Sequence, residues 1–251
     1  MKNSSTSLTK LTLQKFKRNS WGVFSFIFLC ACTCLALFAY VLAPDDSKNA
    51  NQMHLSIHSK SPGFKVKMLK IPYTEEEQNS FSEFFIGKKN TALEIPISDY
   101  IIQDDLLRIT EYNDEGVDGI IKDYPSSLFF KADNINKVPE LYIAEKHFLL
   151  GTDKYGRDLL SRMLIGIRIS LAIGFVSVFI SLIIGISMGA IAGYFGGKVD
   201  AFIMWVINVT WSIPTLLLVI AITLALGKGF WQVFIAVGLT MWVEVARVVR
   251  G

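Results

Sequence analysis

Long uncharged runs divide the chain into blocks. The first run, Trp21–Leu42, has 22 residues without a charge, which is enough for a helix to cross a hydrocarbon core of about 30 Å. Further apolar runs follow late in the chain and include residues 169–193 and 201–227. The pattern predicts an all-α polytopic membrane protein with spans at 21–42, about 169–193, 201–227 and 230–249.

The region between the first two spans has a different pattern. Residues 43–150 mix apolar and charged positions. Within them, 64–73 partly alternates like a strand, whereas 74–85 has capping and helical spacing. The region is therefore predicted to be a mixed α/β insertion between the first and second helices. Polar residues dominate 44–62, and disorder of that part is an alternative.

Basic residues fix the expected orientation. Residues 1–20 contain no acid and five basic side chains: Lys2, Lys10, Lys15, Lys17 and Arg18. The positive-inside rule places this N-terminus in the cytoplasm, and alternation of the spans then places 43–168 outside. The fourth span returns inward and ends at Arg247 and Arg250, which again puts positive charge on the cytoplasmic side.

Composition agrees with a membrane protein, since 51% of the residues are hydrophobic and 19% are charged. The three cysteines, Cys30, Cys32 and Cys34, lie in the first run and read as small apolar side chains. A cleaved signal or lipid attachment is disfavoured because the run continues to Leu42. The spacing of His54 and His58 is weak support for metal, and no metal site is predicted.

Small residues recur every four positions in the second span. The set is Ser177, Ser181, Gly185, Gly189 and Gly193. Helices in lipid associate through close packing, so this face predicts a seam that another helix contacts. The alternative, that glycine is merely common in membrane helices, accounts poorly for five such positions in succession.

The third span contains a proline and a polar stripe. Pro214 lacks an amide hydrogen, which frees the carbonyl of Thr210 and predicts a kink. Four residues around it gather on one side at bilayer depth: Asn208, Trp211, Ser212 and Thr215. Such a stripe must face protein or water. A translocation pathway and plain helix-to-helix hydrogen bonding are equally compatible with it.

The inner end of the fourth span carries Glu244, Arg247 and Arg250. Glu244 and Arg247 are three residues apart on a helix, so a local ion pair is expected. A proton relay at Glu244 is the weaker alternative, since ionisable groups within spans are often functional.

The stretch GTDKYGRDLLSRM, residues 151–163, places turn signals and charges directly before the second span. We call residues 151–168 the collar. Asp153 can cap a short helix, and Asp158 and Arg162 have the i,i+4 spacing of an ion pair. Three arginines are expected to reach water or lipid headgroups: Arg157, Arg162 and Arg168. The collar is therefore interpreted as an interfacial helix at the outer surface.

Four ordered segments carry a resemblance to a known family: GTDKYGRDLLSRMLIGIRISL, GAIAGYFGGKVD, IPTLLL and WVEVARVVRG. The chain resembles the C-type permease subunits of ATP-binding-cassette importers for dipeptides, oligopeptides or nickel. The likeness runs from about His147 to Gly251 and includes the N-terminus with its first helix. It implies a MetI-like transmembrane fold. That family continues past ARVVRG with a Glu-Ala-Ala loop and two more spans, so 151–251 is expected to be a truncated permease core that cannot couple ATP hydrolysis by itself.

The resemblance implies import of peptides by alternating access in the cytoplasmic (inner) membrane of a bacterium. The implied partners are a second homologous permease in a heterodimer, two cytoplasmic ATPases, an extracytoplasmic substrate-binding protein, the peptide substrate and membrane lipid, with no nucleic acid. ATP and Mg²⁺ would bind the ATPases. This chain is expected to hold no cofactor and no catalytic residue, because it lacks a Gly-x-x-x-x-Gly-Lys-Ser/Thr loop.

The resemblance also suggests roles for the sites above. The collar would shape an external gate and docking surface through Gly151, Asp153, Gly156, Arg157, Asp158 and Arg162. Simple anchoring of the helix end is the equal alternative. Pro214 and the polar stripe would line the translocation pathway. Glu244, Arg247 and Arg250 would lead toward the coupling loop.

Other functions remain open. A nickel or other small-solute permease of the same family is one alternative. A membrane-anchored extracytoplasmic sensor or assembly protein would use 43–150, but the 20-residue N-terminus is too small for an output domain. An ion channel is disfavoured, because no filter-like re-entrant segment is evident.

Overall fold

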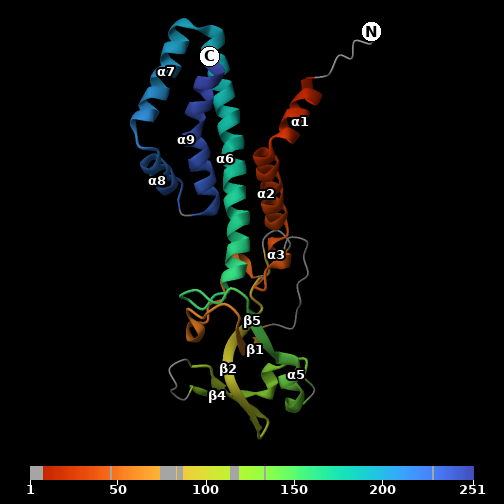
Figure 1. Cartoon of the computed structure of the whole chain (residues 1–251). Coiled ribbons are helices and arrows are strands. Elements are labelled where there is room, and N and C mark those ends of the chain that lie inside the picture. Colours follow the sequence, from red (N-terminus) through yellow and green to blue (C-terminus); the bar gives the residue numbers. More distant parts are fainter. Residues whose placement is uncertain are drawn as a thin grey trace, which may run out of the picture. The chain divides into compact units, whose positions relative to one another are not determined.

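The computed structural model describes residues 8–45, 47–73, 83, 87–113, 119–132, 134–227 and 229–251 (Figure 1). The chain divides into two compact units, Met1–Arg168 and Ile169–Gly251. The first unit contains the N-terminal helices and a β-sheet, and the second contains the later helices.

Three consecutive helices form the start of the described chain: α1 (Leu8–Arg18), α2 (Ser20–Leu37) and α3 (Ala39–Leu42). The Asn19 side chain accepts a hydrogen bond from the Gly22 amide at 3.1 Å and caps α2. The span predicted at 21–42 is thus divided at Phe38, where α2 ends.

Five antiparallel strands form one sheet in the order β4-β3-β2-β1-β5. Their bounds are β1 Phe64–Pro72, β2 Ala92–Gln103, β3 Leu106–Glu111, β4 Ile121–Pro125 and β5 Ile143–Phe148. Asp104 and Asp105 join β2 to β3, and both have positive φ, as a two-residue hairpin turn requires. Among the described strands, β4 and β5 are the outer ones.

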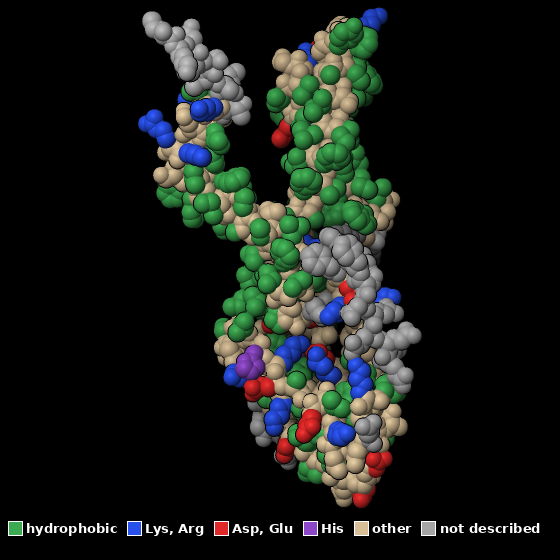
Figure 2. Space-filling model, turned by 90° about the vertical axis from the view of Figure 1, so that its right-hand side faces the viewer, with side chains coloured by type: hydrophobic (Ala, Val, Ile, Leu, Met, Phe, Trp, Pro, Cys, Tyr) green, Lys and Arg blue, Asp and Glu red, His purple; other side chains and the backbone are tan. Residues whose placement is uncertain are grey.

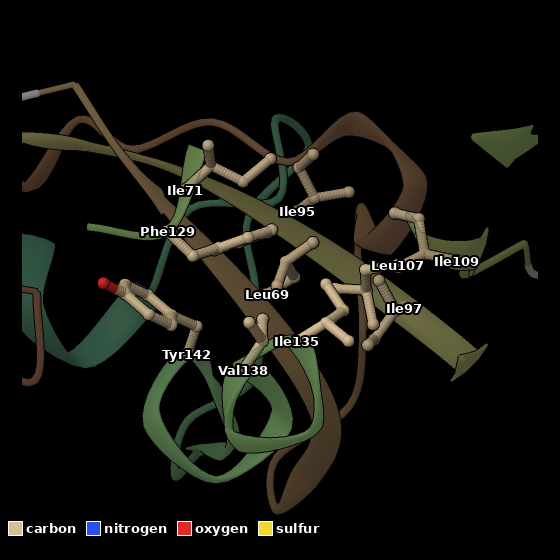
Figure 3. Close-up of a cluster of buried hydrophobic side chains, with 10 residues drawn as sticks. All are labelled: Leu69, Ile71, Ile95, Ile97, Leu107, Ile109, Phe129, Ile135, Val138 and Tyr142. Atoms are coloured by element: carbon tan, nitrogen blue, oxygen red, sulfur yellow. The ribbon is translucent and has the colours of Figure 1, made fainter. Parts of the chain in front are cut away.

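A hydrophobic core lies on one face of this sheet. The helix α5 (Val138–Tyr142) and the 3₁₀ turns η3 (Ser126–Leu128) and η4 (Ile135–Lys137) adjoin that face. Figure 3 shows the cluster: Leu69, Ile71, Ile95, Ile97, Leu107, Ile109, Phe129, Ile135, Val138 and Tyr142. Full burial of each large aliphatic side chain is worth roughly 1.5–3 kcal/mol. The insertion therefore has a core of its own.

The predictions for the insertion have mixed outcomes. The strand predicted at 64–73 is β1, whereas the helix predicted at 74–85 lies outside the described residues except for Glu83. Residues 47–62 are packed, with η1 (Lys48–Ala50) and η2 (Leu55–Ile57) burying Ala50 and Ile57 completely. Disorder there was therefore the wrong alternative for the described part. Placement of the sheet outside the membrane stays a prediction.

One long helix, α6 (Leu159–Phe195), replaces the collar helix and the second span. It has 37 residues and is about 55 Å long at 1.5 Å per residue. The predicted boundary at residue 168 is wrong, because residues 159–168 form the start of the same helix. No proline interrupts the sequence there, and Gly166 is tolerated within the helix.

The third predicted span is two helices, α7 (Gly197–Ser212) and α8 (Thr215–Leu226), which are bent by 96° at the break. Pro214 lies in that break, as the kink prediction required. The carbonyl of Thr210 is not left free, since it accepts the Ile213 amide at 3.3 Å. The fourth predicted span is α9 (Phe230–Arg250), which runs back alongside α6 (Figure 1).

Three described helices are long and apolar enough to cross a membrane: Ser20–Leu37, Leu159–Phe195 and Trp231–Arg250. The bent pair α7 and α8 adds a fourth span if it is counted as one. Only 6% of α2 and 17% of the most apolar part of α6 is buried within the chain. Figure 2 shows mostly hydrophobic side chains along the middle of the helices, with charged ones at helix ends and over the sheet region. These features are those of a multi-pass membrane protein.

Candidate functional site

Two glycines bring the collar into close contact with the segment 54–61. Gly151 and Gly156 have φ values of +75° and +72°. A Cβ on Gly151 would lie 2.1 Å from the carbonyl oxygen of Lys60, and one on Gly156 would lie 1.8 Å from that of His54. Both positions therefore need glycine, for backbone conformation and for space.

Thr152 and Asp153 secure the same loop. The Thr152 hydroxyl accepts the Lys60 amide at 2.9 Å and donates to the Ile57 carbonyl at 2.5 Å. Asp153 Oδ1 accepts the amides of Tyr155 and Arg157 at 2.8 and 3.1 Å. Asp153 thus holds a turn and does not cap a short helix, contrary to the prediction.

The Arg157 guanidinium is bound within the collar. Its Nη2 lies 2.6 Å from Asp153 Oδ2, and its Nη1 donates to Asn51 Oδ1 at 2.9 Å. Burial opposes ionisation of Asp153, but hydrogen bonds from Arg157 and from backbone amides outweigh it. They leave the pKa of this carboxyl below its usual range. Arg157 therefore does not extend into water or lipid headgroups as predicted.

Asp158 starts α6 through a buried polar chain. Its Oδ2 accepts the Ser161 amide at 2.8 Å and also the Ser161 hydroxyl. The same hydroxyl oxygen accepts the Asp45 amide at 2.9 Å. Asp45, Asp158 and Ser161 are all buried. These bonds join the first residues of the insertion to the start of α6.

The remaining collar arginines differ from the predictions. No side-chain ion pair joins Arg162 to Asp158 among the described residues, and Arg162 Nε lies 3.6 Å from Asp153 Oδ2 instead. Arg168 Nη1 donates to the carbonyls of Ala36 and Leu37, each at 3.4 Å, and its guanidinium carbon lies 5.3 Å from the centre of the Tyr40 ring. Arg168 thus binds the end of α2 rather than headgroups.

A buried charged cluster lies beside the collar, between the strands and His54. Glu94 Oε2 is 2.8 Å from Lys146 Nζ, and Oε1 is 3.0 Å from Lys70 Nζ. Burial opposes ionisation of Glu94, but these two ammonium groups outweigh it and keep the pKa of the carboxyl below its usual range. His54 Nε2 lies 3.8 Å from Glu94 Oε2, too far for a hydrogen bond.

Burial determines the protonation of His54, which is 7% exposed. Burial, together with the nearby charge of Lys146, lowers the pKa of the imidazole from 6.5 to about 4. His54 is therefore neutral near pH 7. Its position among polar groups had suggested an exposed, loose segment, and only the folded chain reveals the burial.

The small-residue positions of α6 face α9 within the second unit. A Cβ on Gly185 would lie 2.5 Å from Val245 Cβ, and one on Gly189 would lie 2.5 Å from the Ala246 carbonyl oxygen. Their lack of side chains lets the two helices approach closely.

The two ends of this small-residue stripe differ. Ser177 and Ser181 are buried, and the Ser177 hydroxyl donates to the Phe234 carbonyl of α9 at 3.1 Å. Gly193 is exposed, and a Cβ there would lie 3.3 Å from the Arg250 carbonyl oxygen. The close approach is thus tightest in the middle of the stripe.

The polar stripe of α7 and α8 is exposed within the chain. Asn208, Trp211, Ser212, Pro214 and Thr215 all have exposed side chains. The Ser212 hydroxyl donates back to the Asn208 carbonyl at 2.8 Å, which satisfies it locally. The Asn208 amide has no hydrogen-bond partner among the described residues. This face therefore meets water or another protein surface.

The C-terminal end of α9 has contacts that the sequence did not predict. Among the described residues no ion pair joins Glu244 to Arg247; the Arg247 guanidinium carbon lies 3.7 Å from the centre of the Trp211 ring instead. Arg250 forms a bidentate ion pair with Asp200 near the start of α7. Asp200 is 50 residues away in sequence, so no local spacing could reveal the pair.

These arrangements have different chemical capacities. Most collar groups bind one another and position backbone, although Asp158 Oδ1 is buried without a partner in the described chain. In the second unit, the buried Nε of Arg247 has no acceptor among the described residues, and Asn208 presents an exposed amide. Such groups can recognise a solute without covalent chemistry.

Two family descriptions match separate parts of the chain. Residues 181–251 match "Binding-protein-dependent transport system inner membrane component", and residues 7–62 match "N-terminal TM domain of oligopeptide transport permease C". The first match includes most of the small-residue stripe, the broken helix pair and α9. The second includes α2 and the segment that contacts the collar.

Individual relatives are similar over about half of the chain. A dipeptide transport system permease protein of Lactococcus lactis is 40% identical over 126 residues, which is 48% of this chain and 37% of the relative. An oligopeptide transport system permease protein of Bacillus subtilis is 37% identical over 106 residues, 42% of this chain and 35% of the relative.

A glutathione transport system permease protein of Pectobacterium atrosepticum is 39% identical over 128 residues, 51% of this chain and 41% of the relative. The matched parts thus span about two fifths of the length of these curated relatives. The resemblance predicted from the ordered motifs is confirmed over the parts that match.

Proposed function

We propose that this chain, a multi-pass membrane protein that resembles the C-type permeases of ATP-binding-cassette importers, is a permease subunit that carries peptides across the cytoplasmic membrane. The observation that carries the proposal is the match of 181–251 to an inner membrane component of binding-protein-dependent transport. The similar dipeptide, oligopeptide and glutathione permeases support peptides as the substrate class.

Alternating access is the proposed mechanism. The tight contact of Gly185 and Gly189 with α9 favours movement of α6 and α9 as one body. The break at Pro214 gives α7 and α8 a point at which their angle can change. Exposure of the polar stripe to the pathway would then depend on that angle.

Energy for the cycle is proposed to come from partner subunits. Two cytoplasmic ATPases would bind ATP and Mg²⁺, a second homologous permease would complete the pathway, and an extracytoplasmic binding protein would deliver the peptide. This chain would supply binding and movement, with no catalytic residue or cofactor of its own.

The collar is proposed to fix the position of the start of α6, close to the surface on which the binding protein would dock. Its internal bonds, from Asp153 to Arg157 and from Asp158 to Ser161, favour a structural role for these residues. Arg162 is more exposed than Arg157 and is the better candidate for direct contact with that partner.

Transport in proteoliposomes tests the proposal. The complete transporter that contains this chain, with both permeases, both ATPases and the binding protein, should accumulate a labelled dipeptide or tripeptide only when ATP is supplied. Vesicles without the binding protein serve as the control. Accumulation of Ni²⁺ with no peptide uptake would contradict the substrate class, and uptake independent of ATP would contradict the mechanism.

A further inference from the structure

Arg247 has an unusual environment where α9 meets α7. Its guanidinium lies against the Trp211 ring, with the central carbon 3.7 Å from the ring centre. Its Nε is buried and has no hydrogen-bond acceptor among the described residues. Both helices belong to the second unit, so the contact is internal to it.

A buried guanidinium donor without an acceptor is costly, and most of all within a membrane-spanning helix. The contact with the aromatic ring supplies no hydrogen-bond acceptor, so the N–H groups along the guanidinium edge are not satisfied by it. That edge presents donors in a planar fork that matches a carboxylate. The environment of Arg247 therefore favours an acceptor with two oxygens in one plane.

The nearby acids of this unit do not provide that acceptor. Asp200 is engaged by Arg250 through both carboxylate oxygens. Glu244 is exposed on α9 and forms no ion pair with Arg247 in the described chain. The acceptor must therefore come from another molecule or another part of the protein.

Two further groups suit a peptide. Asn208 lies three residues before Trp211 and thus on the same face of α7. Its exposed amide can both donate to and accept from a peptide group. Trp211 is 54% exposed, so its ring still has surface for an apolar side chain.

We propose that Arg247, Trp211 and Asn208 bind the C-terminal end of the transported peptide. Arg247 pairs with the terminal carboxylate, Asn208 bonds the last peptide group, and Trp211 packs against the last side chain. This inference rests on the proposed function and gives it a substrate feature, the free carboxylate. Because Trp211 lies just before the break at Pro214, a change in the angle of α7 and α8 would alter the site.

The test compares a labelled tripeptide with its C-terminal amide in proteoliposomes of the complete transporter. We expect Arg247→Gln to reduce kcat/KM for the acid by roughly 10- to 100-fold relative to wild type, as loss of a charged hydrogen bond predicts, and to leave the amide nearly unchanged. The binding protein is the same in both transporters, so its own preference cancels.

Arg247→Lys retains the charge and serves as a second variant in case the glutamine variant misfolds. It should show an intermediate loss that is again confined to the acid, because lysine lacks the planar fork. Equal losses for acid and amide in the two variants would overturn the inference and indicate a structural contact, a lipid phosphate or a partner subunit as the acceptor. If wild type transports neither peptide, the proposed function itself fails.

Discussion

The collar and the contact between α7 and α9 are both polar, but their polar groups bond differently. In the collar, Asp153, Arg157 and Asp158 bind other groups of the same unit. In the second unit, Asn208 and Arg247 have no hydrogen-bond partner among the described residues. The polar groups of the collar mainly stabilise the fold, whereas Asn208 and Arg247 have hydrogen-bonding groups that a ligand could bind.

This difference distinguishes two roles of charged residues, stabilising the fold and binding a ligand. The collar is the more charged stretch, and its sequence was equally compatible with an external gate and with simple anchoring of the helix end. Its bonds account for most of its charges. The stripe has a single nearby cation, Arg247, that lacks an acceptor in the described chain. Counting the bonds of each group is thus more informative about function than counting charges.

The largest effect is expected where the collar meets the insertion. Gly156→Ala should lower the free energy of unfolding of the first unit by about 4 kcal/mol. The cause is twofold, because φ at this position is positive and the new Cβ would lie 1.8 Å from the His54 carbonyl oxygen. Protection of residues 43–168 from protease in increasing urea would measure it.

Gly63→Ala is the matched control for Gly156→Ala. Gly63 has a φ of +83° but nothing within 4 Å of a Cβ, so only the backbone cost of about 1–2 kcal/mol is expected. Similar losses for the two variants would show that the close approach at Gly156 does not matter.

A smaller loss is expected at the contact of α6 with α9. Gly185→Ala should lower the free energy of unfolding by about 3 kcal/mol, since its Cβ would lie 2.5 Å from Val245 Cβ and 2.8 Å from the Trp242 carbonyl oxygen. Thermal unfolding of the detergent-solubilised chain would measure the loss. Gly174→Ala, with nothing within 4 Å, is the control and should not destabilise.

Acid should weaken the first unit through His54. Its folded-state pKa of about 4 lies below the ordinary 6.5, so its stabilisation is complete above pH 6.5 and is lost as pH falls toward 4. At pH 5 the loss from this residue should be about 2 kcal/mol.

The urea midpoint for protease protection, measured at pH 7.5 and 5.0, reports this loss. His54→Gln should make the midpoint less sensitive to pH, whereas His147→Gln, at an exposed residue, should leave the sensitivity intact. A pH response that survives His54→Gln unchanged would assign it to other groups, such as Glu94.

The smallest effect tests the comparison directly. Asp158→Ala should destabilise the first unit by about 1 kcal/mol through loss of its bond to the Ser161 amide. Asn208→Ala should leave the stability of the isolated chain unchanged, because no described bond is lost. The same unfolding assays apply, and a clear loss from Asn208→Ala would mean that the stripe serves the fold.

Local signals in the sequence predicted the main helices and the break. Uncharged runs located α2, α6 and α9, because a bilayer requires about 20 apolar residues in one helix. Pro214 predicted the bend, because its effect on hydrogen bonding is confined to one turn. The strand at 64–73 was visible through its alternation.

Contacts between distant residues were not predictable. Asp45 and Ser161 are 116 residues apart, and Asp200 and Arg250 are 50 apart, so neither pair leaves a spacing that can be read. Spacing was misleading for two predicted ion pairs. Asp158 binds Ser161 and Arg162 lies nearest Asp153, whereas Arg247 contacts Trp211 and not Glu244. The candidate site around Trp211 was predicted in part: the polar stripe was recognised, but the contact of Arg247 with the Trp211 ring was not.

The outer strand β4 has a consequence for crowded membranes. It is only five residues long, its Lys122 is paired with Glu111 of β3, and it ends at Pro125, which has no amide hydrogen to share. Short outer strands with lysine and proline are poor templates for a strand from another molecule. Copies of the protein that lie close together should therefore have little tendency to aggregate by pairing through this edge.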